Sequence, residues 1–313
     1  MAYPKVTIII LNWNGLKDTI ECVENLKKIT YPNYEIIVVD NGSRGNDADV
    51  LQEKYRDYIK VIKSKENLGF SAGNNLAIER ALLKNNPPKY VFLLNNDATI
   101  EVNCLNVCVE VAQSSKVGIV GTVVVNSRDN KISFMGTPHF PLASVLDEFF
   151  GLHVLMPYHP PSPTPSFWEV GRVQGCAMLI SSVLLSQIKK DGYYLNSEFF
   201  LYCEEPELCF RARKAGYKVV IARDALTHHY YGKSIGLGTP TPLYYFTRNK
   251  IFLANAVLPW HFKILFHPWY LLIKFIYIFK ALVQGKPEVA SAILQGLYDG
   301  YKGVKGKWIM DNT

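Results

Sequence analysis

The sequence places one carboxylate and two amides directly after an apolar segment. Residues 90–97 read YVFLLNND, so the apolar run ends at Asn95, Asn96 and Asp97. The run predicts a buried strand, and ligands of open α/β sheets bind at the carboxyl ends of such strands. A carboxylate flanked by two amides can hold a hard cation through oxygen ligands. The alternative is a polar turn without a ligand, because Asn and Asp favour turns.

Two earlier apolar segments also end in polar side chains. These are Asn12 and Asn14 at the end of KVTIIILNW (5–13), and Asp40 and Asn41 at the end of EIIVVD (35–40). If the strands are parallel, all these side chains lie at one edge of the sheet, which is the expected nucleotide crevice. Asp40 could then accept a hydrogen bond from a ribose hydroxyl or a base imide. An Asx turn into Gly42 is the alternative.

A glycine-containing loop precedes the third predicted helix. The stretch NLGFSAGNN (67–75) includes Asn67, Gly69 and Asn74. Glycine permits close backbone approach, and a helix N-terminus favours phosphate, so we expect this loop near a nucleotide; a plain strand-to-helix turn is the alternative. The sequence has no G-x-G-x-x-G after its first strand and no G-x-x-x-x-G-K-[ST], which disfavours a dinucleotide dehydrogenase or a P-loop NTPase.

Two adjacent glutamates stand at the start of a predicted helix in FFLYCEEPELCFRARKAG (199–216). Pro206 suits the first helical turn and Gly216 suits the C-terminal cap. Glu204 and Glu205 therefore project from a helix mouth, where a carboxylate can accept a proton from an acceptor hydroxyl. Neutralising the helix dipole is the alternative role.

Strand and helix patterns alternate through about 125 residues. Strands are expected at 5–13, 35–40, 59–64, 90–97 and 117–125, and helices at 15–28, 46–57, 71–86 and 102–115. This alternation predicts an α/β fold with a mainly parallel, doubly wound sheet.

The composition of the chain limits the class of protein and the cellular compartment that we expect. The chain has 313 residues, 49% of them hydrophobic, and a net charge of +7 with a pI near 8.9. This charge fits anionic ligands or an anionic membrane surface but is not extreme enough to indicate nucleic acid. Its six cysteines form no C-x-x-C pair and no export signal is evident, so we expect a reducing cytosol.

The C-terminal region is basic, aromatic and apolar. Residues 257–313 contain seven Lys and no Arg, and the stretch 264–283 is about as long as a membrane span requires. Because His267, Pro268, Lys274 and Lys280 interrupt that stretch, we expect helices in a membrane interface. Core or oligomer contacts and a spanning helix are the alternatives.

Eight motifs together resemble the family 2 glycosyltransferases, and most closely their rhamnosyltransferase-like branch. In chain order they are VTIIILNWNG, VVDNGS, NLGFSAGNN, LLNND, GCAMLI, FFLYCEEPELCFRARKAG, HYYGKS and YYFTRN, which cover about residues 5–250. The resemblance implies the GT-A fold and inverting transfer of a sugar, rhamnose or a related hexose. The donor would be a dTDP- or UDP-sugar, the acceptor a hydroxyl of a glycan or a lipid-linked glycan, and the cofactor Mn²⁺ or Mg²⁺.

The resemblance also implies roles for particular residues. The family usually has Glu-Asp with Asp as the base, so Glu205 takes the base position, and the choice between Glu204 and Glu205 stays open. His229, five residues before Ser234, corresponds to a metal ligand that would join Asp97, with His228 as the alternative. Arg248 in YYFTRN would contact the diphosphate, and a surface ion pair is its alternative role.

These expectations combine into one prediction for the whole chain. Residues 1–255 would form the GT-A catalytic domain, and residues 256–313 a helical region whose segment 256–285 meets the membrane. The protein would be cytoplasmic and peripheral at the inner face of the cell membrane. A non-catalytic nucleotide-sugar-binding scaffold is the alternative from another class. A sugar nucleotidyltransferase is disfavoured because LNWNG, after the first strand, contains no basic residue.

Overall fold

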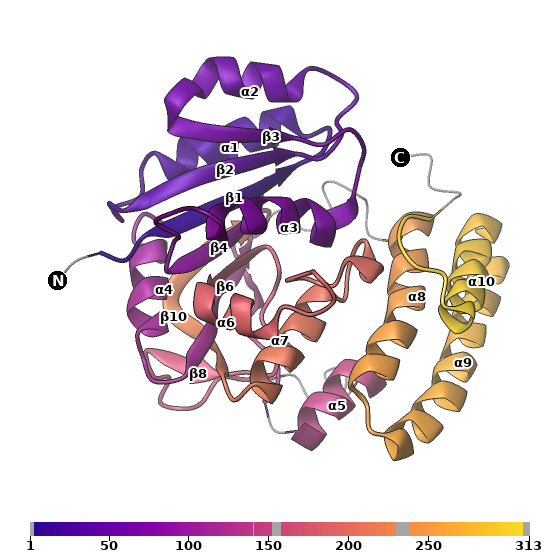
Figure 1. Ribbon diagram of the computed structural model, residues 1–313. Coiled ribbons are helices and arrows are strands. Elements are labelled where there is room, and N and C mark those ends of the chain that lie inside the picture. The colour runs from indigo at the N-terminus through magenta and orange to yellow at the C-terminus, as the bar shows by residue number, and fades with distance from the viewer. Residues whose placement is uncertain (1–2, 140, 152–157, 230–237, 309–313) are drawn as a thin grey trace.

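A computed structural model describes residues 3–139, 141–151, 158–229 and 238–308. These residues form one ten-stranded sheet with helices on both faces and three long helices at one side (Figure 1). The strands are β1 (Val6–Asn12), β2 (Tyr34–Asp40), β3 (Ile59–Lys63), β4 (Tyr90–Asn95), β5 (Ala98–Ile100), β6 (Val117–Asn126), β7 (Ile132–Phe134), β8 (Phe167–Glu169), β9 (Ala177–Ser181) and β10 (Lys218–His229).

The helices follow the pattern that the sequence predicts in the first half of the chain. They are α1 (Leu16–Leu26), α2 (Asp47–Tyr55), α3 (Gly69–Leu82), α4 (Cys104–Ala112), α5 (Pro141–Phe150), α6 (Ser182–Ile188), α7 (Glu204–Lys214), α8 (Pro240–Val257), α9 (Trp260–Val283) and α10 (Pro287–Lys302), with short 3-10 turns η1 (Arg56–Tyr58) and η3 (Ser197–Phe199). The α/β class and the strand–helix alternation are confirmed.

The sheet is parallel on one side and mixed on the other. Its order is β3-β2-β1-β4-β9-β6-β10-β5, and the first four strands are parallel, as predicted. β9 runs antiparallel between β4 and β6, and β5 runs antiparallel to β10. The sequence analysis assigned the motif GCAMLI (175–180) to no strand. In the structure, residues 177–180 of this motif belong to β9.

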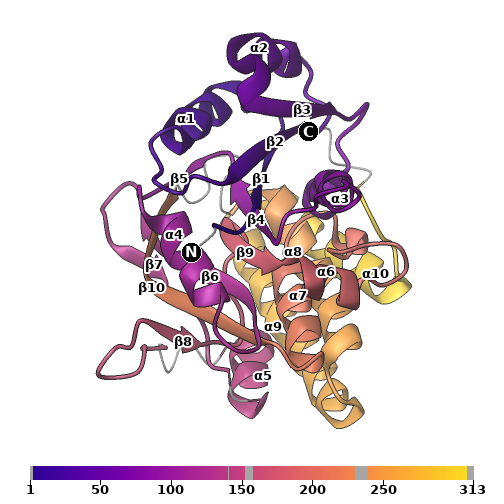
Figure 2. The ribbon, with the colours of Figure 1, turned by 60° about the vertical axis from the view of Figure 1, so that its left-hand side comes forward.

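The apolar strands are buried on both faces. Ile8 and Ile10 face a core shared with α1 and α4, whereas Ile9 faces a core shared with α3, α6 and α7. This alternation explains why β1 is almost wholly apolar, since both of its faces are covered. Figure 2 shows α1 and α4 on one side of the sheet and α3, α6 and α7 on the other.

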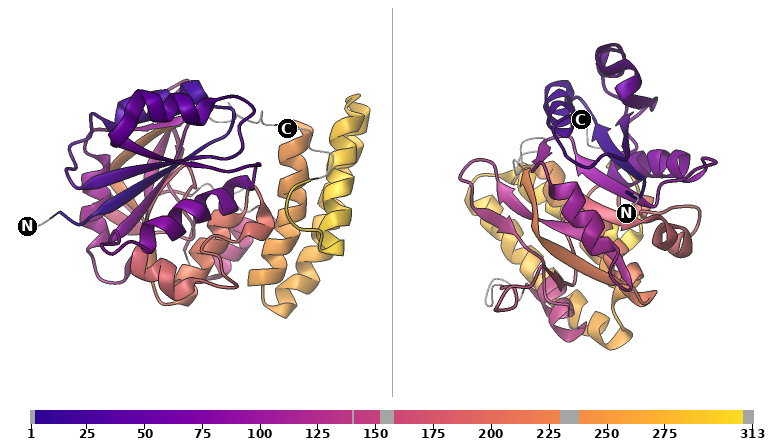
Figure 3. Two further views of the ribbon diagram at one scale, coloured as in Figure 1. Left: turned by 45° about the horizontal axis from the view of Figure 1, so that its top comes forward. Right: turned by 90° about the vertical axis from the view of Figure 1, so that its left-hand side faces the viewer.

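The three C-terminal helices pack as a group beside the sheet. Two views agree that α8, α9 and α10 lie side by side (Figure 3). α10 approaches α8 closely at two glycines, because a Cβ at Gly296 would lie 2.7 Å from the Tyr244 carbonyl oxygen and one at Gly300 would lie 2.6 Å from Ile251 Cδ1. The boundary predicted after residue 255 falls inside α8, so α8 links the sheet to the last two helices.

Candidate functional site

Strand pairing brings Asp97 and His229 together. β5 follows Asp97 directly, and its antiparallel register with β10 sets Ala98 opposite His229. The His229 Nε2 atom lies 3.2 Å from the Asp97 Oδ1 atom, and both side chains are nearly buried. His228 instead lies 2.8 Å from Glu101 Oε1, because neighbouring residues of a strand point to opposite faces.

The pair suits a divalent cation. A carboxylate oxygen and an imidazole nitrogen are both ligands that Mn²⁺ and Mg²⁺ sites use. Over the part of the chain that the structure describes, no cluster of three or more His, Cys, Asp or Glu side chains is available to a metal. Protein ligands alone would therefore leave most coordination positions to water or to a bound anion. Ser234, the motif residue five positions after His229 in the sequence, lies outside the described residues.

Asn12 and Asp40 form a buried network at the end of β1 and β2. Asn12 is fully buried, and its Nδ2 atom donates to Asp40 Oδ1 at 3.1 Å and to Asp47 Oδ2 at 3.0 Å. Thr19 Oγ1 donates to Asn12 Oδ1 at 2.7 Å, and the Ser43 hydroxyl also donates to Asp40. Asn12 therefore orients Asp40 at the sheet edge.

The amides of Asn14, Asn41 and Asn96 bond to neighbouring parts of the protein. The Asn14 Oδ1 atom accepts from the Arg44 N–H at 2.8 Å, and the Asn41 Oδ1 atom accepts from the Leu68 N–H at 3.1 Å. Asn96 Nδ2 lies 3.1 Å from Thr19 Oγ1. These three amides fix the loops that follow the strands.

The loop 67–75 also has a structural role, which corrects the expected close approach of phosphate at Gly69. Gly69 has φ +80°, and a Cβ there would lie 2.4 Å from the Phe200 carbonyl oxygen. The Phe70 N–H donates to this oxygen at 2.6 Å, and Asn74 Nδ2 donates to the Phe70 oxygen at 2.8 Å. Asn67 Oδ1 accepts from the Gly69 N–H at 2.9 Å. The glycine is thus needed for contact with the chain before α7.

The two glutamates differ in their surroundings. Glu204 is 4% exposed, whereas Glu205 is half-buried and lies against Gly175, whose Cβ would be 3.7 Å from Glu205 Cδ. Among the described residues, neither Glu204 Oε2 nor Glu205 Oε2 has a hydrogen-bond partner. An unpaired carboxylate oxygen in a buried position is free to accept a hydrogen bond from a ligand.

Cys176 lies near both Asp97 and Glu205. Burial raises the pKa of the Cys176 thiol, and the charges of Asp97 and Glu205 raise it further. The Cys176 carbonyl also accepts from the Asn95 N–H at 2.9 Å. Asp97 and Glu205 therefore both lie near Gly175 and Cys176, which precede β9.

A partly buried ion cluster that the sequence analysis missed lies near Glu205. Arg172 Nε is 2.9 Å from Glu148 Oε2, and Lys250 Nζ donates both to the Glu148 carboxylate and to its carbonyl oxygen at 3.0 Å. These residues come from the loop before β9, from α5 and from α8. No common spacing joins them in the sequence, so only the fold shows that they meet.

The ion cluster makes the two glutamates unequal. Burial raises the pKa of Glu205, and Arg172, the strongest opposing charge, lowers it, with a smaller contribution from Lys250. Burial, followed by the charge of Glu205, raises the pKa of Glu204 well above its usual range. The pKa of both carboxyls is thus raised, and that of Glu204 is raised further, so Glu204 is the one of the two that is more readily protonated.

Arg248 holds the loop before α7, which corrects the expected contact with a diphosphate. Its guanidinium is fully buried and donates to the Phe199 oxygen at 2.9 Å, the Gly306 oxygen at 2.7 Å and the Tyr244 hydroxyl at 3.3 Å. Asn249 Nδ2 donates to the oxygens of the same loop at Phe199, Leu201 and Tyr202, at 2.8, 2.7 and 3.0 Å. Because its N–H groups already donate to these protein oxygens, the guanidinium cannot offer a pair of N–H groups to a phosphate.

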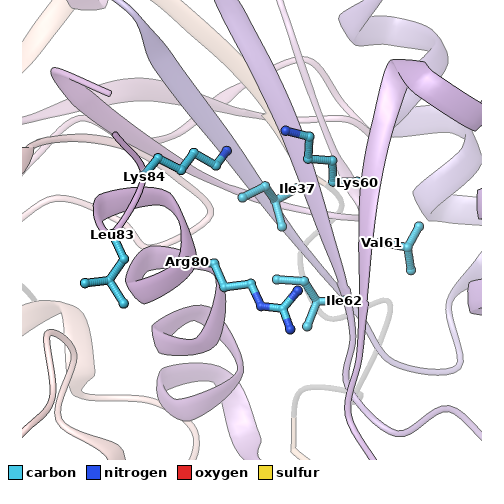
Figure 4. A pocket seen from close by; sticks show the side chains of 7 residues that line it. All are labelled: Ile37, Lys60, Val61, Ile62, Arg80, Leu83 and Lys84. Carbon is cyan, nitrogen blue, oxygen red and sulfur yellow. The ribbon is translucent and has the colours of Figure 1, made fainter. Parts of the chain in front are cut away.

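A groove lies between α3 and the strands β2 and β3. It is lined by Ile37, Lys60, Val61, Ile62, Arg80, Leu83 and Lys84 (Figure 4). Glu35 pairs with Lys60 at 3.5 Å and with Lys84 at 2.6 Å, which offsets much of its positive charge. None of the predicted site residues lines this groove.

Comparisons with known proteins agree with this geometry. Residues 7–186 match the model of glycosyl transferase family 2. A curated relative, the low-salt glycan biosynthesis hexosyltransferase Agl10 from Haloferax volcanii, is 26% identical over 305 residues, which is 96% of this chain and 92% of the relative.

Two solved structures share the fold. The mannosyltransferase PcManGT from Pyrobaculum calidifontis, in complex with GDP-Man and Mn²⁺, has a TM-score of 0.62 and 16% identity and covers 97% of this chain and 89% of its own. S. aureus TarS 1–349, in complex with UDP-GlcNAc, has a TM-score of 0.58 and 17% identity and covers 94% of this chain and 81% of its own. At such identity these similarities show the fold alone.

The structural role of Arg248 can be tested by Arg248→Met. The substitution removes the Arg248 donor from the Gly306 carbonyl and one of the donors from the Phe199 carbonyl, and an unsatisfied buried acceptor typically costs about 1–3 kcal/mol. We expect a correspondingly lower free energy of unfolding in a denaturant titration, while the folded fraction keeps its affinity for nucleoside diphosphate by calorimetry. Unchanged stability combined with lost nucleotide affinity would restore the diphosphate contact.

Proposed function

The chain belongs to glycosyl transferase family 2, and we propose that it transfers a sugar from a nucleoside-diphosphate donor to a hydroxyl group of a glycan or lipid-linked acceptor. The observation that carries this proposal is the position of Asp97, His229 and Glu205. The first two are in contact, and both Asp97 and Glu205 lie near Cys176. A cation site with a carboxylate base close to it suits displacement of a diphosphate by a hydroxyl.

We propose that Asp97 and His229 hold the divalent cation. Bound there, Mn²⁺ or Mg²⁺ would supply positive charge to stabilise the leaving diphosphate. Support comes from the donor set itself and from the solved relative that contains GDP-Man and Mn²⁺. Asn95 and Asn96 flank the site, and Asp40, oriented by Asn12, would bind the base or ribose of the nucleotide.

We propose that Glu205 is the general base. Its side chain would accept the proton of the acceptor hydroxyl through Oε2, which has no partner among the described residues. Arg172 and Lys250 favour its ionised form, while Glu204 stays protonated and adds no second negative charge. One base on the side opposite the leaving group suits a single inverting displacement.

The transferred sugar is proposed as rhamnose or a related hexose. The hexosyltransferase relative supports the hexose class, and its role in glycan biosynthesis suggests that this chain also works on a surface polysaccharide or glycan. Solved relatives with GDP-Man and UDP-GlcNAc support a nucleoside-diphosphate donor. The resemblance to the rhamnosyltransferase-like branch favours dTDP-rhamnose, with a UDP-sugar as the alternative.

We propose that α9 lies in the membrane interface. By length and composition, α9 is the helix among the described residues that could cross a membrane. Large apolar side chains are exposed along this helix; the exposed fraction is 74% for Trp260, 69% for Phe279 and 70% for Val283. The opposite side of α9 packs against α8, where Tyr270 OH donates to the Thr247 oxygen at 3.2 Å. A helix held on one side and apolar on the other suits a position on the membrane surface.

This arrangement leads to the proposed location and organisation of the protein. It would be cytoplasmic and peripheral at the inner face of the cell membrane. The GT-A domain would include the sheet and the first part of α8, and the segment 256–285 would contact lipid. Since α8 and α10 pack together, the two regions would move as one body.

The metal site can be tested by Asp97→Asn, which keeps the size of the side chain and removes its charge. Transfer should be abolished, and Mn²⁺ should no longer increase the affinity for nucleoside diphosphate in calorimetry. Glu101→Gln is the matched control, because Glu101 contacts His228 instead of His229. Full activity in Asp97→Asn, or in excess chelator, would contradict the assignment.

The base can be tested by comparing Glu205→Gln with Glu204→Gln. Loss of a general base typically lowers turnover by about 10²–10⁴-fold, so Glu205→Gln should do so while nucleotide affinity stays unchanged. Glu204→Gln should have a much smaller effect, because the native side chain is already protonated.

The pH profile adds a second readout for the base. The base must be ionised, so kcat/KM should fall as the pH is lowered through the raised pKa of Glu205. Arg172→Gln removes the charge that lowers this pKa and should move the acidic limb to higher pH. If Glu204→Gln causes the large loss instead, the base is Glu204.

Membrane binding can be tested with the full chain carrying Phe275→Glu and Phe279→Glu. The wild type should float with anionic liposomes, and high salt should weaken this binding without eliminating it. Two charges on the exposed face should abolish flotation. Leu83→Glu with Ile132→Glu is the control, since both side chains are exposed on the sheet domain. Equal flotation of both double variants would exclude α9 as the contact.

A further inference from the structure

Lys274 occupies a position of α9 where an apolar side chain would be expected. The packing face of α9 consists of Phe266, Tyr270, Ile278 and Ala281, all buried against the neighbouring helices. Lys274 falls midway between Tyr270 and Ile278, four residues from each, and therefore lies on the same face of the helix. A lysine at this position must lose part of its hydration, which is unfavourable unless a partner compensates.

The ammonium of Lys274 faces aromatic rings and a second lysine. Its Nζ atom lies 5.1 Å from the ring centre of Tyr270 and 5.8 Å from that of Tyr277. Among the described residues, no carboxylate forms an ion pair with it. Lys250, whose charge acts on Lys274, is itself paired with Glu148, which also pairs with Arg172.

The electrostatic surroundings of Lys274 agree with this excess of positive charge. Burial, followed by the charge of Lys250, lowers the pKa of Lys274 to about 8. The charged form is thus destabilised in the protein as it stands. A bound anion would stabilise it, because a nearby opposite charge favours ionisation.

The position of Lys274 relative to the catalytic carboxylates gives the anion a role. Tyr270 and Phe266 belong to the same buried cluster as Cys203, which directly precedes Glu204 and Glu205. On its outer side, α9 exposes Leu272, Phe275 and Ile276, each more than half exposed. Lys274 is therefore near Cys203, the residue before the glutamates, on a helix whose outer face is apolar.

We propose that Lys274 binds the phosphate of a lipid-linked acceptor. The phosphate or diphosphate that joins sugar to lipid would contact the ammonium, the hydrocarbon chain would follow the exposed face of α9, and the sugar would extend toward Glu205. This inference rests on the proposed function for the identity of the ligand as an acceptor. The binding site itself rests on the contacts of Lys274.

The test measures binding of lipid phosphates to the full chain in neutral detergent micelles. Calorimetry would use farnesyl diphosphate, farnesol and inorganic pyrophosphate as probes. The wild type should bind farnesyl diphosphate at least about tenfold more tightly than farnesol, as expected for a charge-assisted contact. Lys274→Met should reduce this preference to about twofold or less. Lys280→Met, on the exposed part of the same helix, should keep it.

Thermal unfolding and nucleotide affinity of Lys274→Met distinguish loss of the proposed site from loss of the fold. Lys274→Met should unfold at the same or a higher temperature, because methionine packs in an apolar seam, and should keep its Mn²⁺-dependent affinity for nucleoside diphosphate. Undiminished preference for farnesyl diphosphate in Lys274→Met would overturn the proposal. Lys274-dependent binding of pyrophosphate as tight as that of farnesyl diphosphate would overturn the lipid assignment. Lys274-dependent lipid binding without transfer from any donor would support the site and contradict the proposed function.

Discussion

The position of the two adjacent glutamates depends on a strained loop that α8 holds in place. Phe200, Tyr202 and Cys203, just before Glu204, have φ of 62°, 66° and 72°, a conformation that non-glycine residues rarely adopt. Such strain persists only where surrounding contacts enforce it. Here Asn249 and Arg248 supply them, through hydrogen bonds to the carbonyl oxygens of the loop. The helices α9 and α10 pack against α8, so the C-terminal region helps to fix the position of the glutamates.

Buried charge explains how two adjacent glutamates can have different roles. Two neighbouring ionised carboxylates repel each other, and burial raises the pKa of both Glu204 and Glu205. Arg172 and Lys250 favour the ionised form of Glu205, whereas burial and the charge of Glu148 oppose it. The same cluster joins the loop before β9, α5 and α8. The charges near the proposed base therefore depend on the packing of α5 and α8.

The sequence predicted those features of the structure that depend on local residue patterns. Periodicity gave the strands and helices of the first half, and the resemblance named Asp97 and His229, which pairing of β5 with β10 brings into contact. It did not predict the antiparallel β9 or the ion cluster, since these depend on residues far apart in the chain. It also misassigned Arg248 and Gly69, because a buried arginine and a turn glycine look the same in sequence as residues that bind phosphate.

The protonation of the glutamate pair is the most direct test of the proposed catalytic site. Infrared spectroscopy at neutral pH distinguishes the carbonyl band of a protonated carboxylic acid from the bands of a carboxylate. The wild-type chain should show a buried protonated carboxyl that disappears in Glu204→Gln and persists in Glu205→Gln. A band that disappears only in Glu205→Gln would show that Glu205 holds the proton and would contradict its assignment as the base.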